Sequence, residues 1–180
     1  MSLEEMKAKV LLMIEEYNED EDTLSNDEDL GNKLNTVINQ IQNELARYKK
    51  IPAYKTMEVE EGQQISIKDI ADDIYQLNTI KGIKYETIDD FIIFNETGTA
   101  KIYYYRYPKQ IDQDTEDDYE FELSTDALEI MPYGVAGDIL KSDVSESYGN
   151  IYYNRYREMM SMLDPRNHTE SIYISGGVDI

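Results

Sequence analysis

The sequence predicts an α+β protein in which a helical base, formed by two N-terminal and two C-terminal helices packed together, is interrupted by a small antiparallel β insertion. Three observations support this fold class. Apolar residues recur at helical spacing in residues 1–52 and again in residues 124–164. Between them, residues 53–123 carry short runs rich in aromatic and β-branched side chains, which favour strands. Residues 165–180 follow as a C-terminal tail.

The N-terminal helices are indicated by a capping residue and by apolar stripes. Ser2 can cap a first helix that runs to about Tyr17, and the glutamates after it suit the positive end of the helix dipole. The acidic stretch 18–29 predicts a solvated loop. The second helix ends at Ile51-Pro52, because a residue before proline avoids the helical region. Its apolar stripe and the polar residues on its opposite face are Leu34, Val37, Ile38, Ile41, Leu45 and Tyr48, against Asn35, Asn39, Gln42 and Asn43.

The insertion predicts a β unit of about four or five strands. Residues 95–99 lie between two strand-like runs and predict a hairpin turn, whereas residues 70–77 favour a short helical turn. After an acidic loop at 112–118, residues 119–123 predict a short strand or an extended arm. The strand-like runs are 54–59, 64–67, 80–85, 91–94 and 100–105.

The C-terminal helices are indicated in the same way. A serine or threonine at 124–125 caps a helix whose stripe contains Pro132, so we expect either a kink or two short helices joined there. The glycines and alanine at 134–137 are small enough to let another helix approach closely. A serine at 145 or 147 caps the last helix, which carries a tyrosine-rich face and ends at Asp164-Pro165.

The net charge of −21 is concentrated in two segments. Residues 15–29 hold nine acids and residues 112–122 hold seven, with no base in either, which leaves 22 acids against 17 bases elsewhere. The absence of a basic face argues against specific DNA binding, and the acidic segments suit a protein partner with a basic patch. No apolar run approaches the roughly 18 residues of a membrane helix. The acidic N-terminus lacks the apolar centre of a signal peptide, so we expect a protein that acts inside a cell.

The chain lacks the side chains from which most enzymes build an active site. It has no cysteine and one histidine, His168, which we interpret as an exposed loop residue. It has no nucleophile elbow and no phosphate-binding loop. The carboxylates at 112–118 lie in a run too polar to bury one of them, as glycosidase chemistry requires. We therefore predict no catalytic residue and no cofactor, and a protein that works by assembling with others.

The first acidic stretch partly matches a calcium-binding loop. Position 6 of the EF-hand register is Thr23 where a glycine makes the turn, and position 12 is an aspartate, which is too short for the usual bidentate contact. We predict no metal site and keep a calcium-binding interaction module as an alternative. The residues at positions 1, 3, 5, 9 and 12 are Asn18, Asp20, Asp22, Asn26 and Asp29.

Tyrosine is frequent, with 16 residues against three phenylalanines and no tryptophan. Its ring offers a large contact area with a polar tip, which is favoured at interfaces. One cluster lies on a predicted strand and one on the last helix; each is either an interface or ordinary core and sheet surface. The run 172–175 in the tail either adds to a neighbouring sheet edge or is a disordered end. The interface candidates are Tyr103, Tyr105, Tyr148, Tyr152, Tyr156, Ile172 and Ile174.

The order of elements resembles the head-to-tail connector or adaptor proteins of tailed bacteriophages, found in phages and prophages of Gram-positive bacteria. Two segments, which cover roughly a third of the chain, carry the resemblance: LNTVINQIQNELARYKKIPAY at 34–54, and FELSTDALEIMPYGVAGDILKSDVSESYGNIYYNRYREMMSML at 121–163. In the second, a polar cap leads through Met131-Pro132-Tyr133 into a small-residue helix. An aspartate-containing break follows, and then a helix with Tyr153-Asn154-Arg155-Tyr156.

The resemblance implies a virion structural protein that assembles in the bacterial cytoplasm and docks as a ring of identical copies between the portal and the tail or stopper proteins. It implies no active-site residue to carry over. The alternative from another class is an acidic inhibitor that mimics DNA, which would need its charge spread along a curved surface rather than held in two segments.

Overall fold

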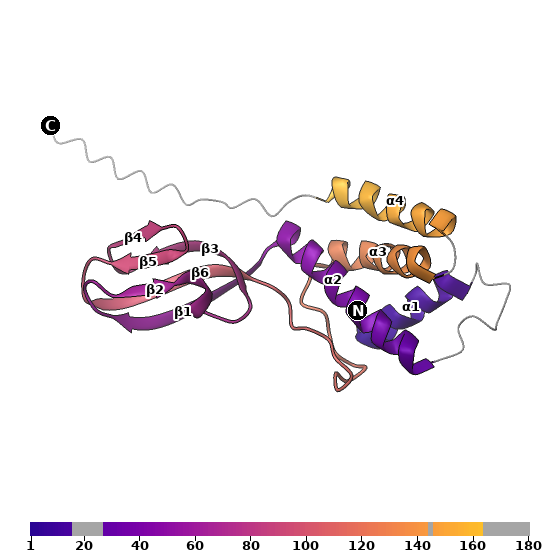
Figure 1. Cartoon of the computed structure of the whole chain (residues 1–180), viewed down its shortest axis with the longest axis horizontal. Helices are drawn as coiled ribbons and strands as arrows, with labels where there is room; N and C mark the ends of the chain where they lie inside the picture. Colours follow the sequence, from indigo (N-terminus) through magenta and orange to yellow (C-terminus); the bar gives the residue numbers. More distant parts are fainter. Residues whose placement is uncertain (16–26, 144–145, 164–180) are drawn as a thin grey trace.

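The computed structural model describes residues 1–15, 27–143 and 146–163, and these residues confirm the α+β fold class. They form four α-helices, taken from both ends of the chain, and two antiparallel sheets of three strands each from the segment between. Figure 1 shows the helices gathered at one end of an elongated molecule and the sheets at the other.

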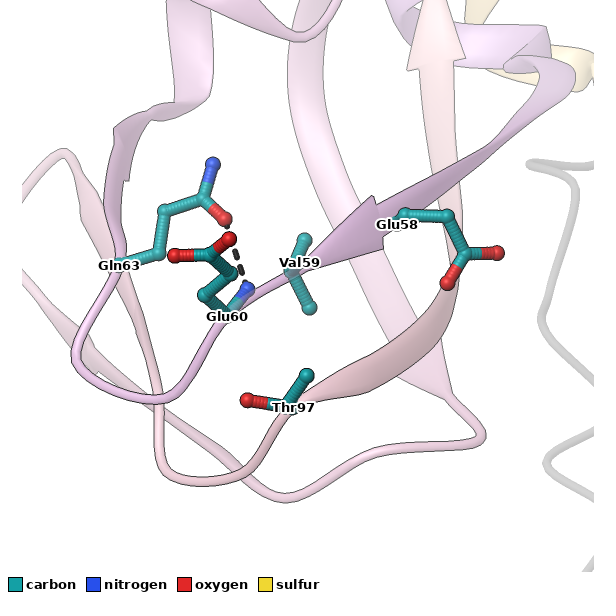
Figure 2. A pocket seen from close by; sticks show the side chains of 5 residues that line it. All are labelled: Glu58, Val59, Glu60, Gln63 and Thr97. Carbon is teal, nitrogen blue, oxygen red and sulfur yellow. Dashed lines mark hydrogen bonds between the residues drawn. The ribbon is translucent and has the colours of Figure 1, made fainter.

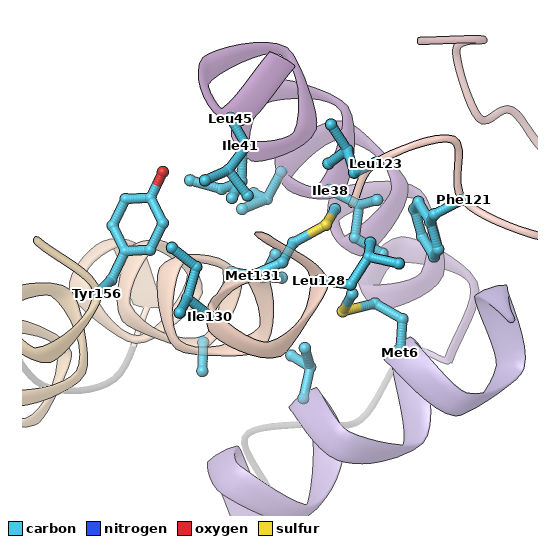
Figure 3. Close-up of a cluster of buried hydrophobic side chains, with 14 of the residues drawn as sticks. Met6, Ile38, Ile41, Leu45, Phe121, Leu123, Leu128, Ile130, Met131 and Tyr156 are labelled. Carbon is cyan, nitrogen blue, oxygen red and sulfur yellow. The ribbon is translucent and has the colours of Figure 1, made fainter. Parts of the chain in front are cut away.

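The helical base is built around α3 (Thr125–Asp143), which contacts α1 (Leu3–Glu15), α2 (Asp27–Lys49) and α4 (Glu146–Met162). The apolar stripes expected from the sequence meet in one buried cluster that all four helices share. Figure 3 shows side chains of α1, α2, α3 and α4 converging in this cluster, together with apolar side chains from the segment before α3.

The first helix begins as predicted, and two other helix boundaries differ. Ser2 caps α1 in a reciprocal pair: its Oγ accepts the Glu5 N–H at 3.2 Å, and the Glu5 carboxylate accepts the Ser2 N–H at 3.1 Å. Helix α2 begins at Asp27, inside the stretch expected as a loop, because acidic residues are favourable in a first turn. Helix α3 runs through Pro132 as one element rather than two short helices. Its packing against three other helices outweighs the backbone hydrogen bond that proline removes.

The close contact between α3 and α4 depends on glycine, in line with the small residues noted at 134–137. A Cβ atom on Gly137 would lie 2.7 Å from the backbone N of Tyr153. One on Gly149 would lie 2.6 Å from the backbone N of Lys141. Such distances are not tolerated, so any larger residue at either position would force the two helices apart.

The β unit contains six strands among the described residues, where four or five were expected. Every strand pairing is antiparallel, and the two sheets enclose an apolar cluster of their own, separate from that of the helices. One sheet has the order β1-β6-β3, formed by Ile51–Val59, Gly98–Arg106 and Ile74–Lys81. The other has the order β2-β5-β4, formed by Gln64–Ser66, Phe91–Phe94 and Tyr85–Ile88.

Three expectations about the β unit are wrong. Residues 70–77 are not a helical turn, because the 3-10 helix η2 (Ile67–Asp69) ends before them and β3 begins at Ile74. The segment 95–99 is not a hairpin turn, because β5 and β6 belong to different sheets and the segment crosses between them. The run 80–85 is not one strand, because Gly82, at a φ of 89°, turns the chain from β3 into β4.

Residues 107–123, called the strap below, return the chain from β6 to α3. The sequence pattern places them with the β insertion, but Ile111, Phe121 and Leu123 are buried in the helical cluster. The expected extended arm at 119–123 pairs with the N-terminus through a bridge between Ser2 and Glu120. The strap therefore lies along the helical base and ties the β unit to it.

Candidate interaction surfaces

The tyrosines of β6 alternate between the two faces of the first sheet, as a strand requires. Tyr104 lies in the apolar cluster between the sheets, and its neighbours Tyr103 and Tyr105 lie on the outer face. Tyr103 remains partly exposed, but Tyr105 is only 2% exposed. Its burial corrects the expectation that Tyr105 is available to a partner.

Tyr105 is buried because β3 and the end of α2 cover it. The Tyr75 ring stacks on it with centroids 6.3 Å apart, and Lys50 Nζ lies 5.0 Å from its ring centroid. Tyr75 in turn donates its hydroxyl hydrogen bond to the Ala46 carbonyl oxygen at 3.0 Å. Burial above all, with the Tyr107 hydroxyl second, raises the pKa of Tyr75 to about 12, so it stays protonated and donating at neutral pH. These contacts form a joint between the sheet and the helical base.

Beyond this joint, the outer face of the first sheet carries a group of tyrosines and lysines, called the tyrosine–lysine face below: Tyr54, Lys81, Lys101 and Tyr103. Tyr54 and Tyr103 are cross-strand partners with ring centroids 6.0 Å apart, and Lys81 and Lys101 are partners across β3 and β6. Lys101 Nζ lies 4.3 Å from the Tyr54 centroid and 5.2 Å from that of Tyr103. Lys81 Nζ lies 5.3 Å from the Tyr103 centroid. The face is open to solvent, since Tyr54 is 61% exposed.

The tyrosines of α4 differ sharply in burial. Tyr156 is fully buried and donates its hydroxyl hydrogen bond to Glu44 at 3.0 Å. Burial and then the Glu44 carboxylate raise its pKa, so Tyr156 is a protonated core residue and not an interface residue, which corrects the expectation. Tyr152 is half-buried and donates to the Met13 carbonyl oxygen in α1 at 3.2 Å. Tyr148 is exposed, as an interface residue would be.

Helix α4 also presents an exposed apolar stripe to solvent. Tyr148, Ile151 and Met162 are 41%, 56% and 71% exposed. Their spacing of three and eleven residues places them on one side of the helix, where the exposed ion pair of Arg155 and Glu158 lies between Ile151 and Met162. Exposed apolar side chains bordered by charged ones are typical of a contact surface. This stripe is called the α4 stripe below.

A row of amide side chains on α2 holds the strap, and the sequence placed these residues on the polar face opposite the apolar stripe. Asn39 donates from Nδ2 to the Ile111 carbonyl oxygen at 2.7 Å and accepts the Ile111 N–H at 2.8 Å. Asn35 donates to the Asp112 carbonyl oxygen at 3.1 Å, and Gln42 donates to that of Lys109 at 3.1 Å. The spacing 35, 39 and 42 follows one helix face. That regular polar stripe was the signal in the sequence.

Ionic contacts reinforce the same connection. Arg106, at the end of β6, makes a two-pronged contact with Glu122 of the strap, at 3.0 and 2.5 Å, and lies 3.8 Å from Asp73. The hydrogen bond from Arg106 lowers the pKa of Glu122 and keeps it charged. A cavity of about 440 Å³ lies beside these residues, lined by Asn43, Asp72, Asp73, Arg106, Tyr107, Pro108, Lys109 and Gln110. Its arginine is already paired with carboxylates, so these contacts serve to fix the strap.

A second cavity, of about 450 Å³, lies at the end of the β unit farthest from the helices. Figure 2 shows that the Glu58 and Glu60 side chains extend in different directions, so they do not form a pair of facing carboxylates. Glu58 accepts a hydrogen bond from the Thr99 hydroxyl at 2.7 Å, and Gln63 accepts the backbone N–H of Glu60 at 2.9 Å. The arrangement lacks the close coupling of two carboxyl groups that acid–base chemistry uses.

Several predicted positions lie outside the described residues. These are His168, the tail positions Ile172 and Ile174, and the calcium candidates Asn18, Asp20, Asp22 and Asn26. The backbone of Asp29, the last calcium candidate, lies in α2. Within the ranges that the structure describes, no three or more histidine, cysteine or acidic residues are grouped so as to hold a metal ion.

No protein-family model matches this sequence, and no curated protein matches it. Among the helices in the described ranges, none combines the length and apolar character that crossing a membrane requires.

Proposed function

We propose that the protein is a structural head-to-tail connector of a tailed bacteriophage, which docks as a ring of identical copies between the portal and the tail. The observation that carries this proposal is the way the two resembling segments fold. Residues 34–54 and 121–163 lie far apart in the sequence, and their helices α2, α3 and α4 pack into one base from which the β unit extends (Figure 1). That is the arrangement which the resemblance implies.

The shape of the molecule supports a connecting role. Two separate apolar clusters form two bodies, one helical and one of β-strands, at opposite ends. The stacked tyrosines, the amide row and the Arg106–Glu122 contact tie one body to the other. A part that lies between two larger assemblies has to hold its ends in a fixed relation, and these contacts would do so.

The α4 stripe supports side-by-side packing of helical bases. It lies on the outer surface of α4, away from the buried side that carries Tyr156. An exposed apolar stripe of this kind would be covered when identical bases meet in a ring. The high net charge of −21 would help to keep the protein dissolved before it is incorporated.

Electron microscopy of the purified protein with the portal protein of the same genome tests the proposal. We expect rings of the protein on the portal. Ile151→Glu with Met162→Glu should abolish them, because both changes place a charge in the α4 stripe. The matched control is Leu12→Glu, which places a charge on a similarly exposed apolar side chain of α1 (62% exposed), away from the α4 stripe. Absence of wild-type rings and of any portal binding would refute the connector function.

A further inference from the structure

The two lysines of the tyrosine–lysine face are not neutralised by a carboxylate of the described part of the chain, although 38 acids outnumber 17 bases in the sequence. Within the described residues, Lys81 and Lys101 form no ion pair, and their contacts are with the rings of Tyr54 and Tyr103. The face is therefore a local positive surface on a strongly negative protein, and it suits an anionic partner.

The geometry of the face limits what that anion is. Single-stranded nucleic acids bind such surfaces by stacking bases on exposed aromatic rings. Here the lysine Nζ atoms already lie over the rings, between 4.3 and 5.3 Å from the centroids. A base that stacked on the ring faces next to these lysines would have to displace them, whereas a carboxylate can approach the ammonium groups directly. The arrangement favours an acidic polypeptide.

The chain itself supplies such a polypeptide in the acidic loop of the strap, residues 112–118. Five of its seven residues are acids. Asp114, Glu116 and Asp118 are exposed, and their carboxylates have no hydrogen bond or ion pair within the described residues. Asp112 accepts hydrogen bonds within the loop from the Thr115 hydroxyl and the Asp114 N–H, which fixes the loop's shape. Figure 1 shows the strap leaving the end of β6 and looping out beside the helical base before it enters α3.

The loop cannot reach the tyrosine–lysine face of its own chain. Asn35 and Asn39 hold the backbone of residues 111 and 112 against α2, at 2.7 to 3.1 Å. The face lies on the β unit at the other end of the molecule. A contact between these two surfaces therefore requires two copies of the chain.

We propose that the tyrosine–lysine face of one copy binds the acidic loop 112–118 of a second copy. Lys81 and Lys101 pair with carboxylates of the loop, and Tyr54 and Tyr103 cover the lysine side chains on the other side. The two surfaces differ, so the contact is head-to-tail and can repeat around a ring. The inference rests on the proposed function for the ring, but the contact itself can be tested without a portal.

Carbodiimide cross-linking tests the contact, because it joins a lysine amine to a carboxylate that touches it. Normal and isotopically heavy protein are mixed, so mass spectrometry distinguishes links between copies from links within one copy. We expect links between copies from Lys81 or Lys101 to the peptide that contains 112–118. Absence of such links, or equal linking of the exposed lysines Lys9 and Lys68, would overturn the proposal.

A charge exchange adds a test of specificity. We expect the wild-type protein to self-associate in sedimentation experiments. The double variant Lys81→Glu/Lys101→Glu should lose both the cross-links and this self-association, and the double variant Asp114→Lys/Glu116→Lys should lose them too. A mixture of the two variants should recover association, because the lysine loop of one meets the glutamate face of the other. Lys9→Glu with Lys68→Glu carries the same charge change elsewhere and should behave as wild type. Failure of the mixture to recover association would contradict the assigned pairing.

Two further outcomes separate this inference from the proposed function. Rings on the portal that persist in the Lys81→Glu/Lys101→Glu variant would refute the contact and leave the connector function standing. Links of the expected kind in a protein that never binds a portal would support the contact and refute the connector function. Binding of a labelled single-stranded oligonucleotide that the same variant abolishes would overturn the choice of partner.

Discussion

Because Asn39 makes the central hydrogen bonds between α2 and the strap, the structure predicts that its substitution by alanine destabilises the fold. Its side chain donates to the Ile111 carbonyl oxygen at 2.7 Å and accepts the Ile111 N–H at 2.8 Å, and Ile111 is 4% exposed. Asn39→Ala removes both bonds and leaves a buried peptide group without partners, whereas Gln42, which also donates to Asn39 Oδ1 at 2.8 Å, keeps its hydrogen bond to the Lys109 carbonyl oxygen. The strap then loses its central attachment to the helical base.

The magnitude follows from these contacts. Two hydrogen bonds contribute about 1 kcal/mol each, and a buried polar group left unpaired adds about 1 kcal/mol or more. Alanine recovers about 0.6 kcal/mol because it is a better helix former than asparagine. We therefore expect Asn39→Ala to lower the free energy of unfolding by about 2 to 3 kcal/mol.

Asn43→Ala is the matched control, one turn further along α2. Asn43 accepts a single hydrogen bond from the Gln110 side chain at 3.1 Å, so its loss should be almost offset by the same gain in helix propensity. Equilibrium unfolding in urea measures both variants. Hydrogen exchange at the Ile111 amide should rise in Asn39→Ala alone. A difference below about 0.5 kcal/mol between the variants, with unchanged exchange, would refute the structural role of Asn39.

Three other variants test separate parts of the fold. Gly137→Ala should destabilise the fold by about 1 to 3 kcal/mol, because its Cβ atom would collide with the Tyr153 backbone. Gly31→Ala is the control and should stabilise the fold by up to about 1 kcal/mol, because the space around Gly31 is open. Thermal unfolding of the two variants measures the difference. Tyr75→Phe should cost about 1 kcal/mol at neutral pH. The raised pKa of Tyr75 contributes stability below pH 10 that is lost as the pH rises toward about 12, so the variant should show a weaker alkaline loss of stability in pH-dependent denaturation. Glu122→Gln should flatten the acid limb of the same profile: the lowered pKa of Glu122 stabilises the fold above its ordinary pKa, and that contribution disappears as the pH falls through the lowered value. An unchanged acid limb would show that this carboxylate does not contribute.

The helical base could be predicted because its signals are local. The stripe from Leu34 to Tyr48 and the cap at Ser2 specify helices whatever the rest of the chain does. The start of α2 was missed because its first turn is acidic, and acidic residues suit both a loop and a helix start. The sequence left open whether Pro132 kinks one helix or separates two, because the packing of three other helices decides this and those contacts are not readable along one segment.

The pairing of strands depends on contacts that no local pattern contains. The segment 95–99 has the composition of a hairpin turn, yet β5 and β6 pair with other strands, since β6 becomes the central strand between β1 and β3. The alternation of side chains along the strand correctly placed Tyr104 on one face and Tyr103 and Tyr105 on the other. It could not indicate which of the two outer tyrosines would be covered. Tyr105 is buried because Tyr75 and Lys50 reach over it from other elements.

Helix α2 was predicted from the sequence, but the contact between its row of amide side chains and the strap was not. Asn35, Asn39 and Gln42 lie opposite the most apolar side of α2, where solvent is the ordinary expectation. Their partner is a segment about 70 residues away that has no regular structure of its own and therefore needs side-chain hydrogen bonds for its backbone. Evenly spaced amides on one helix face, paired with a long polar connection elsewhere, are the signal that would have revealed the contact.

The stiffness of the joint has a consequence for assembly. The proposed contact uses one surface on the β unit and another on the helical base. The Tyr75 stack, the amide row and the Arg106–Glu122 contact hold these two bodies together. Each added copy would therefore be rotated by the same angle relative to the one before.

A head-to-tail contact with a constant rotation closes into a ring when that rotation divides a full turn, and otherwise continues as a filament. Loosening the joint with Asn39→Ala should then broaden the range of assembly sizes seen by electron microscopy before it abolishes the pairwise cross-link. A variant that lost the cross-link while keeping uniform rings would contradict this order of events.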